Sequence, residues 1–182
     1  MTQPESVQDQ DQDPEAAEAA LRTVNWLRGS AQNDPAFLPG LLRKGAFAPL
    51  VDGLEYARDT GCEDVYWGVC KLFGHYYRAS DHGQKFGWYG SGSMGAAVSR
   101  LTYWRSGSLG RGPELYLGAL IRRRGLPWRE LTRACESLRK HDRQPPEWSR
   151  LILDLTHWPR PDVIHTWTAD FYFHSKEPNP YA

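Results

Sequence analysis

Apolar side chains recur every three or four residues through most of this chain, which is the period of one face of an α-helix. The clearest case is residues 63–79, where the spacing predicts a long amphipathic helix. A first helix is predicted from Pro14, a residue that suits the first helical position, to the residue before Gly29. The positions expected to face inward on these two helices are Ala17, Ala20, Leu21, Val24, Leu27, Val65, Val69, Leu72, Phe73, Tyr76 and Tyr77.

Glycine and proline mark where further helices begin and end. A short helical stretch is predicted after Asp34-Pro35, and another over residues 46–59. In the second half of the chain, Ser93 is expected to cap a helix that reaches about Trp104. Two further helices are expected to start at prolines, over 113–124 and over 127–141. Two more helices, around Trp148 and around Trp167, carry tryptophans and complete the chain.

No segment alternates apolar and polar residues with the period of a β-strand, so the fold is predicted to be all-α. Residues 1–13 are acidic and lack periodicity, and we expect them to form a disordered tail. Residues 80–92 are rich in Gly and Ser and predict a linker between two small helical lobes. The N-terminal helical lobe would span 14–85 and the C-terminal helical bundle 86–175, followed by a short tail at 176–182.

The formal net charge of zero hides a strong asymmetry along the chain. The first 20 residues contain six acidic and no basic side chains, whereas residues 98–150 contain 12 basic and five acidic ones. A concentrated basic region attracts polyanions because binding releases the counterions condensed on them. Arginine outnumbers lysine 17 to 5, which suits bidentate contacts to phosphate. The charge pattern therefore predicts a nucleic-acid partner.

Several classes of protein are disfavoured by the sequence. No apolar run approaches the roughly 18 residues that span a membrane, and the acidic N-terminus is unlike a signal peptide. The three cysteines fit no zinc pattern and predict buried thiols in a reducing, cytoplasmic setting. We expect no cofactor and no metal.

The sequence offers few groups of residues that could form a catalytic site. Asp154 with His157, and Asp170 with His174, could pair on one face of a helix, but the spacing suggests no third ligand. These pairs are interpreted as structural, and the protein is predicted not to be an enzyme.

Residues 90–95 have the G-x-G-x-x-G spacing of a dinucleotide-binding loop. That function needs a preceding strand within a βαβ unit, and no convincing core strand precedes Gly90. The motif is interpreted as a linker that enters a capped helix. Two alternatives stay open: that the helix N-terminus holds a phosphate through its free amides, and that Trp88 or Tyr89 stacks on a base.

The basic residues of the second half gather on few helix faces. Arg122-Arg123-Arg124 closes one predicted helix, and Arg129, Arg133 and Lys140 share a face of the next, with Arg139 and Arg143 beside it. A solvated face with cations near helix C-termini is the plain alternative. The density of cations favours a surface that tracks a phosphate backbone without reading bases.

The last third of the chain has an ordered set of tryptophan motifs. Glu147-Trp148 is followed by Asp154-Leu155 and Trp158, and then by Trp167 with Asp170-Phe171-Tyr172. Together with Ser93-Met94-Gly95 and the Arg-rich helices, this set resembles the CasB family, the small subunit of the type I-E CRISPR Cascade complex. The resemblance covers roughly residues 35–173 and is strongest from 93 to 173. This chain departs from the family pattern at Leu115 and Tyr116, just after Glu114, where family members often have arginine.

The resemblance implies a non-enzymatic subunit of a larger assembly. Its partners would be the other type I-E Cascade subunits, CRISPR RNA, target DNA and a second copy in a head-to-tail dimer. It would stabilise the R-loop, meaning the CRISPR RNA–target duplex and the displaced strand. The residues predicted to contact nucleic acid are Arg43, Lys44, Arg100, Arg105, Arg111, Arg122, Arg123, Arg129, Arg133, Arg139, Lys140, Arg143 and Arg160.

Two other functions remain open from the sequence. A helical DNA-binding regulator would need a helix-turn-helix, for which 113–124 and 126–141 are the candidate pair. Trp128, Arg129 and Glu130 fit poorly as base-reading residues at the start of its second helix. A helical adaptor that binds only proteins would instead direct its arginines at acidic partners.

Overall fold

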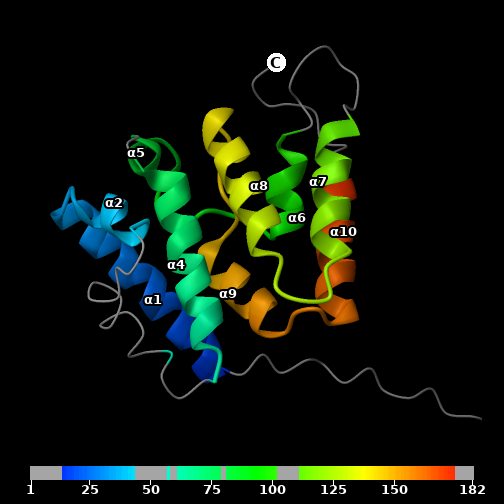
Figure 1. Ribbon diagram of the computed structural model, residues 1–182, viewed down its shortest axis with the longest axis horizontal. Helices are drawn as coiled ribbons and strands as arrows, with labels where there is room; N and C mark the ends of the chain where they lie inside the picture. The colour runs from blue at the N-terminus through cyan, green and yellow to red at the C-terminus, as the bar shows by residue number, and fades with distance from the viewer. Residues whose placement is uncertain (1–13, 44–56, 58–60, 79–80, 102–110, 175–182) are drawn as a thin grey trace, which may run out of the picture.

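The computed structural model describes residues 14–43, 57, 61–78, 81–101 and 111–174, and Figure 1 gives its ribbon. All regular structure in these residues is helical, which confirms the predicted all-α fold. The helices are α1 (Pro14–Asn33), α2 (Phe37–Leu41), α4 (Glu63–Tyr77), α5 (His82–Phe86), α6 (Met94–Ser99), α7 (Arg111–Ile121), α8 (Trp128–Lys140), α9 (Trp148–Thr156) and α10 (Pro161–His174).

Helix α4 lies at the centre and packs against α2, α8 and α9 (Figure 1). Its predicted inward residues are all buried. Phe73, Tyr76 and Tyr77 meet the ring of Trp148 from α9 with centroid separations of 5.6 to 6.1 Å. Burying large aromatic side chains stabilises a fold through their area and their edge-to-face contacts. The aromatic residues that recur at helical spacing in 63–79 are therefore part of the core.

Helices α6 and α10 approach so closely that a glycine is required between them. A Cβ added at Gly95 would lie 1.8 Å from the Trp167 carbonyl oxygen. Ser93 caps α6 as predicted, because its Oγ accepts a hydrogen bond from the Ala96 amide at 3.2 Å. The end of the G-x-G-x-x-G motif thus permits close packing of two helices.

The predicted linker over 80–92 contains helix α5 and is packed against the core. The ring centroids of Trp88 and Tyr77 lie 4.8 Å apart. The indole of Trp88 also covers Gly83, where an added Cβ would lie 2.2 Å from the ring. Tyr89 donates its hydroxyl hydrogen to Asn25 Oδ1 at 2.7 Å. The core is shared by helices before and after this segment, and the boundary between two lobes stays a prediction.

Helix ends differ from the predictions by a few residues. Helix α1 continues through Gly29 to Asn33, since one glycine costs a helix only about 1 kcal/mol. Leu21 was expected inside but is 45 % exposed, on the edge of a hollow beside α9 and α10. Helix α7 ends at Ile121, before the arginines. The candidate helix at 46–59 lies outside the described residues except for Ala57.

Candidate nucleic-acid interface

Helix α8 has one apolar face and one basic face. Leu131, Ala134, Cys135 and Leu138 are buried against the core. Arg129, Arg133 and Lys140 are exposed on the other side, as their spacing predicted. Trp128 fixes the start of the helix, because its ring lies directly over Gly68 of α4, 2.2 Å from where a Cβ would be. The core thus holds this row of cations in a defined orientation.

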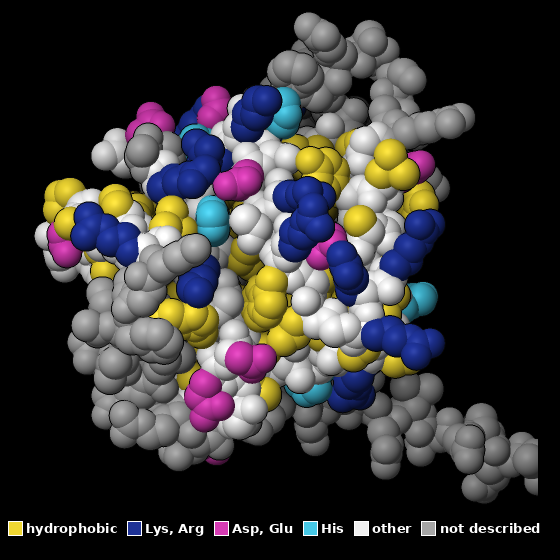
Figure 2. Space-filling view, in the orientation of Figure 1, with side chains coloured by type: hydrophobic (Ala, Val, Ile, Leu, Met, Phe, Trp, Pro, Cys, Tyr) yellow, Lys and Arg dark blue, Asp and Glu magenta, His cyan; other side chains and the backbone are white. Residues whose placement is uncertain are grey.

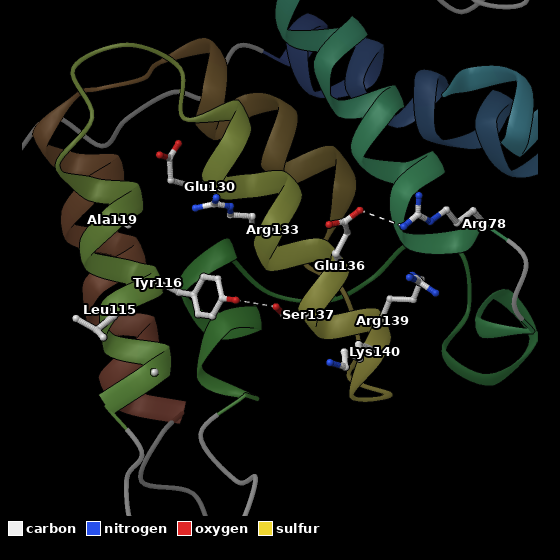
Figure 3. Close-up of a pocket in the computed structure, with 11 residues that line it drawn as sticks. Arg78, Leu115, Tyr116, Ala119, Glu130, Arg133, Glu136, Ser137, Arg139 and Lys140 are labelled. Atoms are coloured by element: carbon white, nitrogen blue, oxygen red, sulfur yellow. Dashed lines mark hydrogen bonds and ion pairs between the residues drawn. The ribbon is translucent and has the colours of Figure 1, made fainter. Parts of the chain in front are cut away.

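A groove of about 760 Å³ separates α7 from α8 (Figure 3). Leu115, Tyr116 and Ala119 form its α7 wall, and Arg133 lies across from them on α8. The two walls are joined where the hydroxyls of Tyr116 and Ser137 lie 2.9 Å apart. The residues that line the groove are Arg78, Gly112, Leu115, Tyr116, Ala119, Glu130, Arg133, Glu136, Ser137, Arg139 and Lys140.

The two glutamates of this α7–α8 groove are already paired. Arg78 donates to Glu136 at 3.1 Å, and His75 Nδ1 lies 3.3 Å from the same oxygen. Arg123 donates to Glu130 at 2.6 Å, and this hydrogen bond lowers the pKa of the Glu130 carboxyl. Three cations of the groove have no ion-pair partner among the residues that the structure describes: Arg133, Arg139 and Lys140. The groove therefore has an excess of positive charge available to an anion.

The basic surface extends from the groove along the turn between α7 and α8. Arg122, Arg123 and Arg124 are exposed there. Trp158 Nε1 holds this turn, because it donates to the carbonyl oxygens of Arg123 at 3.2 Å and Gly125 at 3.1 Å. In Figure 2, Lys and Arg side chains gather over α7 and α8 with hydrophobic side chains between them. Arg160 follows Trp158 by two residues and pairs with Asp162 at 3.3 Å.

Arg100 is engaged inside the fold. Its guanidinium donates to the carbonyl oxygens of Ser91 at 2.8 Å, Gln144 at 3.0 Å and Pro145 at 3.1 Å. Burial lowers the pKa of this arginine. Its donors are directed at backbone carbonyls, so Arg100 clamps two loops and is not part of the exposed basic surface.

The remaining predicted residues are placed in several different ways. Arg43 is exposed after α2, which packs on α1 and α4, away from the α7–α8 groove. Arg143 is half-buried, and its carbonyl accepts a hydrogen bond from Tyr76 at 2.7 Å. Lys44 and Arg105 lie outside the described residues, and Arg111 is described only as the first residue of α7. These contacts stay predictions.

Packing accounts for the residues of three alternative sites that the sequence raised: a phosphate site at the N-terminus of α6, base stacking by Trp88, and the Asp residues of the Asp–His pairs. Helix α6 is buried from its capping Ser93 onward, so its N-terminal amides face the protein interior. Trp88 lies within an aromatic cluster of the core. Trp167 donates to Asp154 at 2.6 Å, and Arg150 donates to Asp170 at 3.3 Å. In the described part of the chain, no three His, Cys, Asp or Glu side chains gather as metal ligands would.

Sequence reasoning missed two parts of the groove. Arg78 comes from the end of α4 and reaches the groove only through the packing of α4 on α8. The apolar α7 wall was visible in the sequence only as a departure, because Leu115 and Tyr116 occupy positions where arginine was expected. Leu115 is 71 % exposed where it lines the groove.

Comparison with known proteins decides the family. The model of the family described as CRISPR-associated protein Cse2 matches residues 17–172. The chain belongs to the Cse2 family. Cse2, also called CasB, is the small subunit of type I-E Cascade, so the resemblance found in the tryptophan motifs is confirmed. No curated protein and no solved structure matches this chain.

The Cse2 match includes every described helix except the first residues of α1 and the end of α10. The whole α7–α8 groove lies within the matched range, whereas residues 1–16 precede it. Across the described residues, no helix is long and apolar enough to cross a membrane.

Proposed function

We propose that this Cse2-family protein holds nucleic-acid backbone on the basic face of α8 and on the α7–α8 turn. In this role it would stabilise the CRISPR RNA–target DNA R-loop, including the displaced strand, within type I-E Cascade. The observation that carries the proposal is the charge balance of the groove. Its glutamates are neutralised by Arg78 and Arg123, while Arg133, Arg139 and Lys140 have no ion-pair partner in the described residues.

A modest number of such contacts is enough for this function. Forming the RNA–DNA hybrid is a near-balanced exchange for the DNA duplex, so contacts to the opened strands can tip it. Each phosphate that is neutralised adds to binding independently of sequence. A rigid row of arginines on α8 provides these contacts without a base-reading element.

A structural role for the acidic residues supports a protein without catalytic activity. Asp154 accepts a hydrogen bond from Trp167, and Asp170 accepts one from Arg150. His157 Nδ1 lies 2.9 Å from the Leu153 carbonyl oxygen. The carboxyls of Asp154 and Asp170 are thus engaged in holding α9 and α10 together.

Partners besides nucleic acid are part of the proposal. We infer contacts with other Cascade subunits and a head-to-tail pair of copies in the complex. A contiguous patch of apolar side chains left in solvent is typical of a surface that a partner covers, whereas singly exposed ones are common. Leu115 is 71 % exposed near the start of α7, and Phe173 is 67 % exposed near the end of α10.

The helix-turn-helix regulator receives no support from the geometry. A recognition helix must project its first turn into the major groove. The first residue of α8 is Trp128, which packs on Gly68 of the central helix. The adaptor that binds only proteins is separated from our proposal by its prediction of no nucleic-acid binding even at low salt.

The test is reconstitution of the complex. The tagged protein is co-expressed with the other Cascade subunits and CRISPR RNA of its source genome, and target-DNA affinity is compared with and without it. Stable incorporation with tighter target binding is the expected result. Incorporation without any change in affinity would contradict the role in the R-loop, and failure to incorporate would contradict the subunit role.

A further inference from the structure

Helix α7 has uncharged side chains on two of its faces. Pro113, Leu117 and Leu120 are buried on the face that covers the core. A second row borders the α7–α8 groove at the helical spacing i, i+3, i+4 and i+7, and we call it the outer row: Gly112, Leu115, Tyr116 and Ala119. A helix that only covers a core is polar on its outer side. The outer row is contiguous and lacks charge, so it indicates a contact beyond the packing of the core.

The opposite wall of the groove is cationic. Helices α7 and α8 run antiparallel and are joined by the turn that follows Ile121 (Figure 3). The hydroxyls of Tyr116 and Ser137 lie 2.9 Å apart, and Ser137 falls between Arg133 and Lys140 along α8. The outer row is therefore level with cations that have no ion-pair partner among the described residues.

The two walls also have the same length. The outer row runs from Gly112 to Ala119, and the cations run from Arg133 to Lys140. Each row covers two turns of helix, a rise of about 10.5 Å. Successive nucleotides of one strand in a DNA helix are about 3.4 Å apart, so each row spans about three stacked nucleotides. A strand lying along the groove would have cations on one side and the outer row on the other.

An unpaired strand of nucleic acid has the chemistry that these two walls require. Its phosphates would supply about three negative charges over this length, one for each of Arg133, Arg139 and Lys140. Its bases are unpaired, so their faces and edges are open to aromatic and apolar side chains. A duplex keeps its bases paired and stacked in its interior and would leave the outer row without a contact. The groove therefore favours an opened strand over a duplex.

We propose that the outer row of α7 contacts the bases of the strand whose phosphates lie on α8. Leu115 and the ring of Tyr116 are the side chains that meet the bases. The presence of the strand rests on the proposed function, and the contact to its bases goes beyond it. The contact is independent of sequence, because every base has an apolar face. It makes binding depend on the bases being unpaired, which cations alone would not do.

Fluorescence anisotropy of the full chain with two oligonucleotides tests this contact. One is poly-dT, and the other has the same length and number of phosphates but carries abasic sites throughout. We expect poly-dT to bind about tenfold more tightly at low salt, since contacts to single bases contribute about fivefold or more each. Equal affinity for the two would overturn the base contact, leave the phosphate contacts in place and assign the outer row to a protein partner. Binding of neither would overturn the proposed function together with this inference.

Three variants locate the preference on the outer row. L115A should weaken binding of poly-dT about fivefold and leave binding of the abasic strand unchanged. Its fold should persist, because Leu115 is exposed and alanine favours a helix. R133M removes a phosphate contact and should weaken binding of both strands by the same factor. The matched control is L21A on α1, an exposed leucine outside the groove, which should change neither affinity. A full preference for poly-dT in L115A would place the bases elsewhere and overturn the assignment.

Discussion

The indole nitrogen of Trp167 donates to Oδ2 of Asp154 at 2.6 Å, and this bond joins the two C-terminal helices. Asp154 belongs to the first tryptophan motif and Trp167 to the second. Trp158 continues the contact, because its ring centroid lies 5.0 Å from that of Trp167. The two motifs that indicate the family are therefore halves of one packing unit, which also positions the α7–α8 turn through Trp158.

The Asp154 carboxyl should make stability depend on pH. Burial is the largest influence on it and raises its pKa above the ordinary value, against the opposing hydrogen bond from Trp167. Between the ordinary and the raised pKa, the folded state binds more protons than the unfolded state, so the free energy of unfolding falls as pH rises. The D154N variant keeps an acceptor for Trp167 and lacks this titration. Relative to the parent, it should gain stability as pH increases from 3 to 7.

Urea unfolding of both proteins across this range measures the effect. Groups distant from Asp154 titrate equally in the two proteins, so the difference between their unfolding free energies reports the titration of Asp154 and of the charged neighbours that it influences, Arg150, Asp170 and His157. A difference that is constant with pH would contradict the burial of an ionisable carboxyl at this position.

The contact between α6 and α10 should not accept a methyl group. In G95A the new Cβ would meet the Trp167 carbonyl at 1.8 Å, and backbone must move to relieve the clash. We expect a loss of at least about 1–3 kcal/mol in unfolding free energy, the usual cost of overpacking. The matched control is G118A in α7, where nothing lies within 4 Å and alanine should stabilise by about 0.5–1 kcal/mol. Thermal or denaturant melts of both variants decide this, and similar stability of the two would contradict the close approach.

Charge reversal on the basic face should weaken target binding without unfolding the protein. The variant R122E/R133E/K140E removes three exposed cations, none of which makes an ion pair with a described residue. If each contacts one phosphate, the slope of log affinity against log salt should become shallower by about 2–3. Binding of target DNA by reconstituted complex, measured at several salt concentrations, gives this slope. The single reversals R133E on α8 and K71E on α4 change the net charge equally, so comparing the two variants controls for net charge. Unchanged target affinity in the folded triple variant would exclude this face.

Two arginines that look alike in sequence should behave oppositely. Replacing Arg100 by methionine leaves the buried carbonyls of Ser91, Gln144 and Pro145 without their charged donor. We expect R100M to lower unfolding free energy by about 2–3 kcal/mol. Arg133 is exposed, and R133M should change stability by less than about 0.5 kcal/mol while weakening nucleic-acid binding. Denaturant midpoints for both variants test the assignment. Equal stability of R100M and the parent would return Arg100 to the candidate surface.

The sequence alone was sufficient for the helical class and for the part of the core that α4 supplies. Helix periodicity is a local property, so the inward residues of 63–79 and the polar face of α8 followed from residue spacing. The cap at Ser93 followed from local chemistry in the same way. The tryptophan motifs identified the family because their order along the chain records a specific packing unit.

What each arginine does was decided only by the tertiary structure. Arg100 and Arg133 have the same chemistry, but the loops that surround Arg100 are brought together by contacts across 44 and 45 residues. The pairing of Glu136 with Arg78 likewise joins residues 58 positions apart. Such neighbours depend on how helices pack, and local spacing carries no information about them. The sequence therefore determined that positive charge is concentrated on few helices, and the packing of α4, α7 and α8 determined which of those charges are left open to a partner.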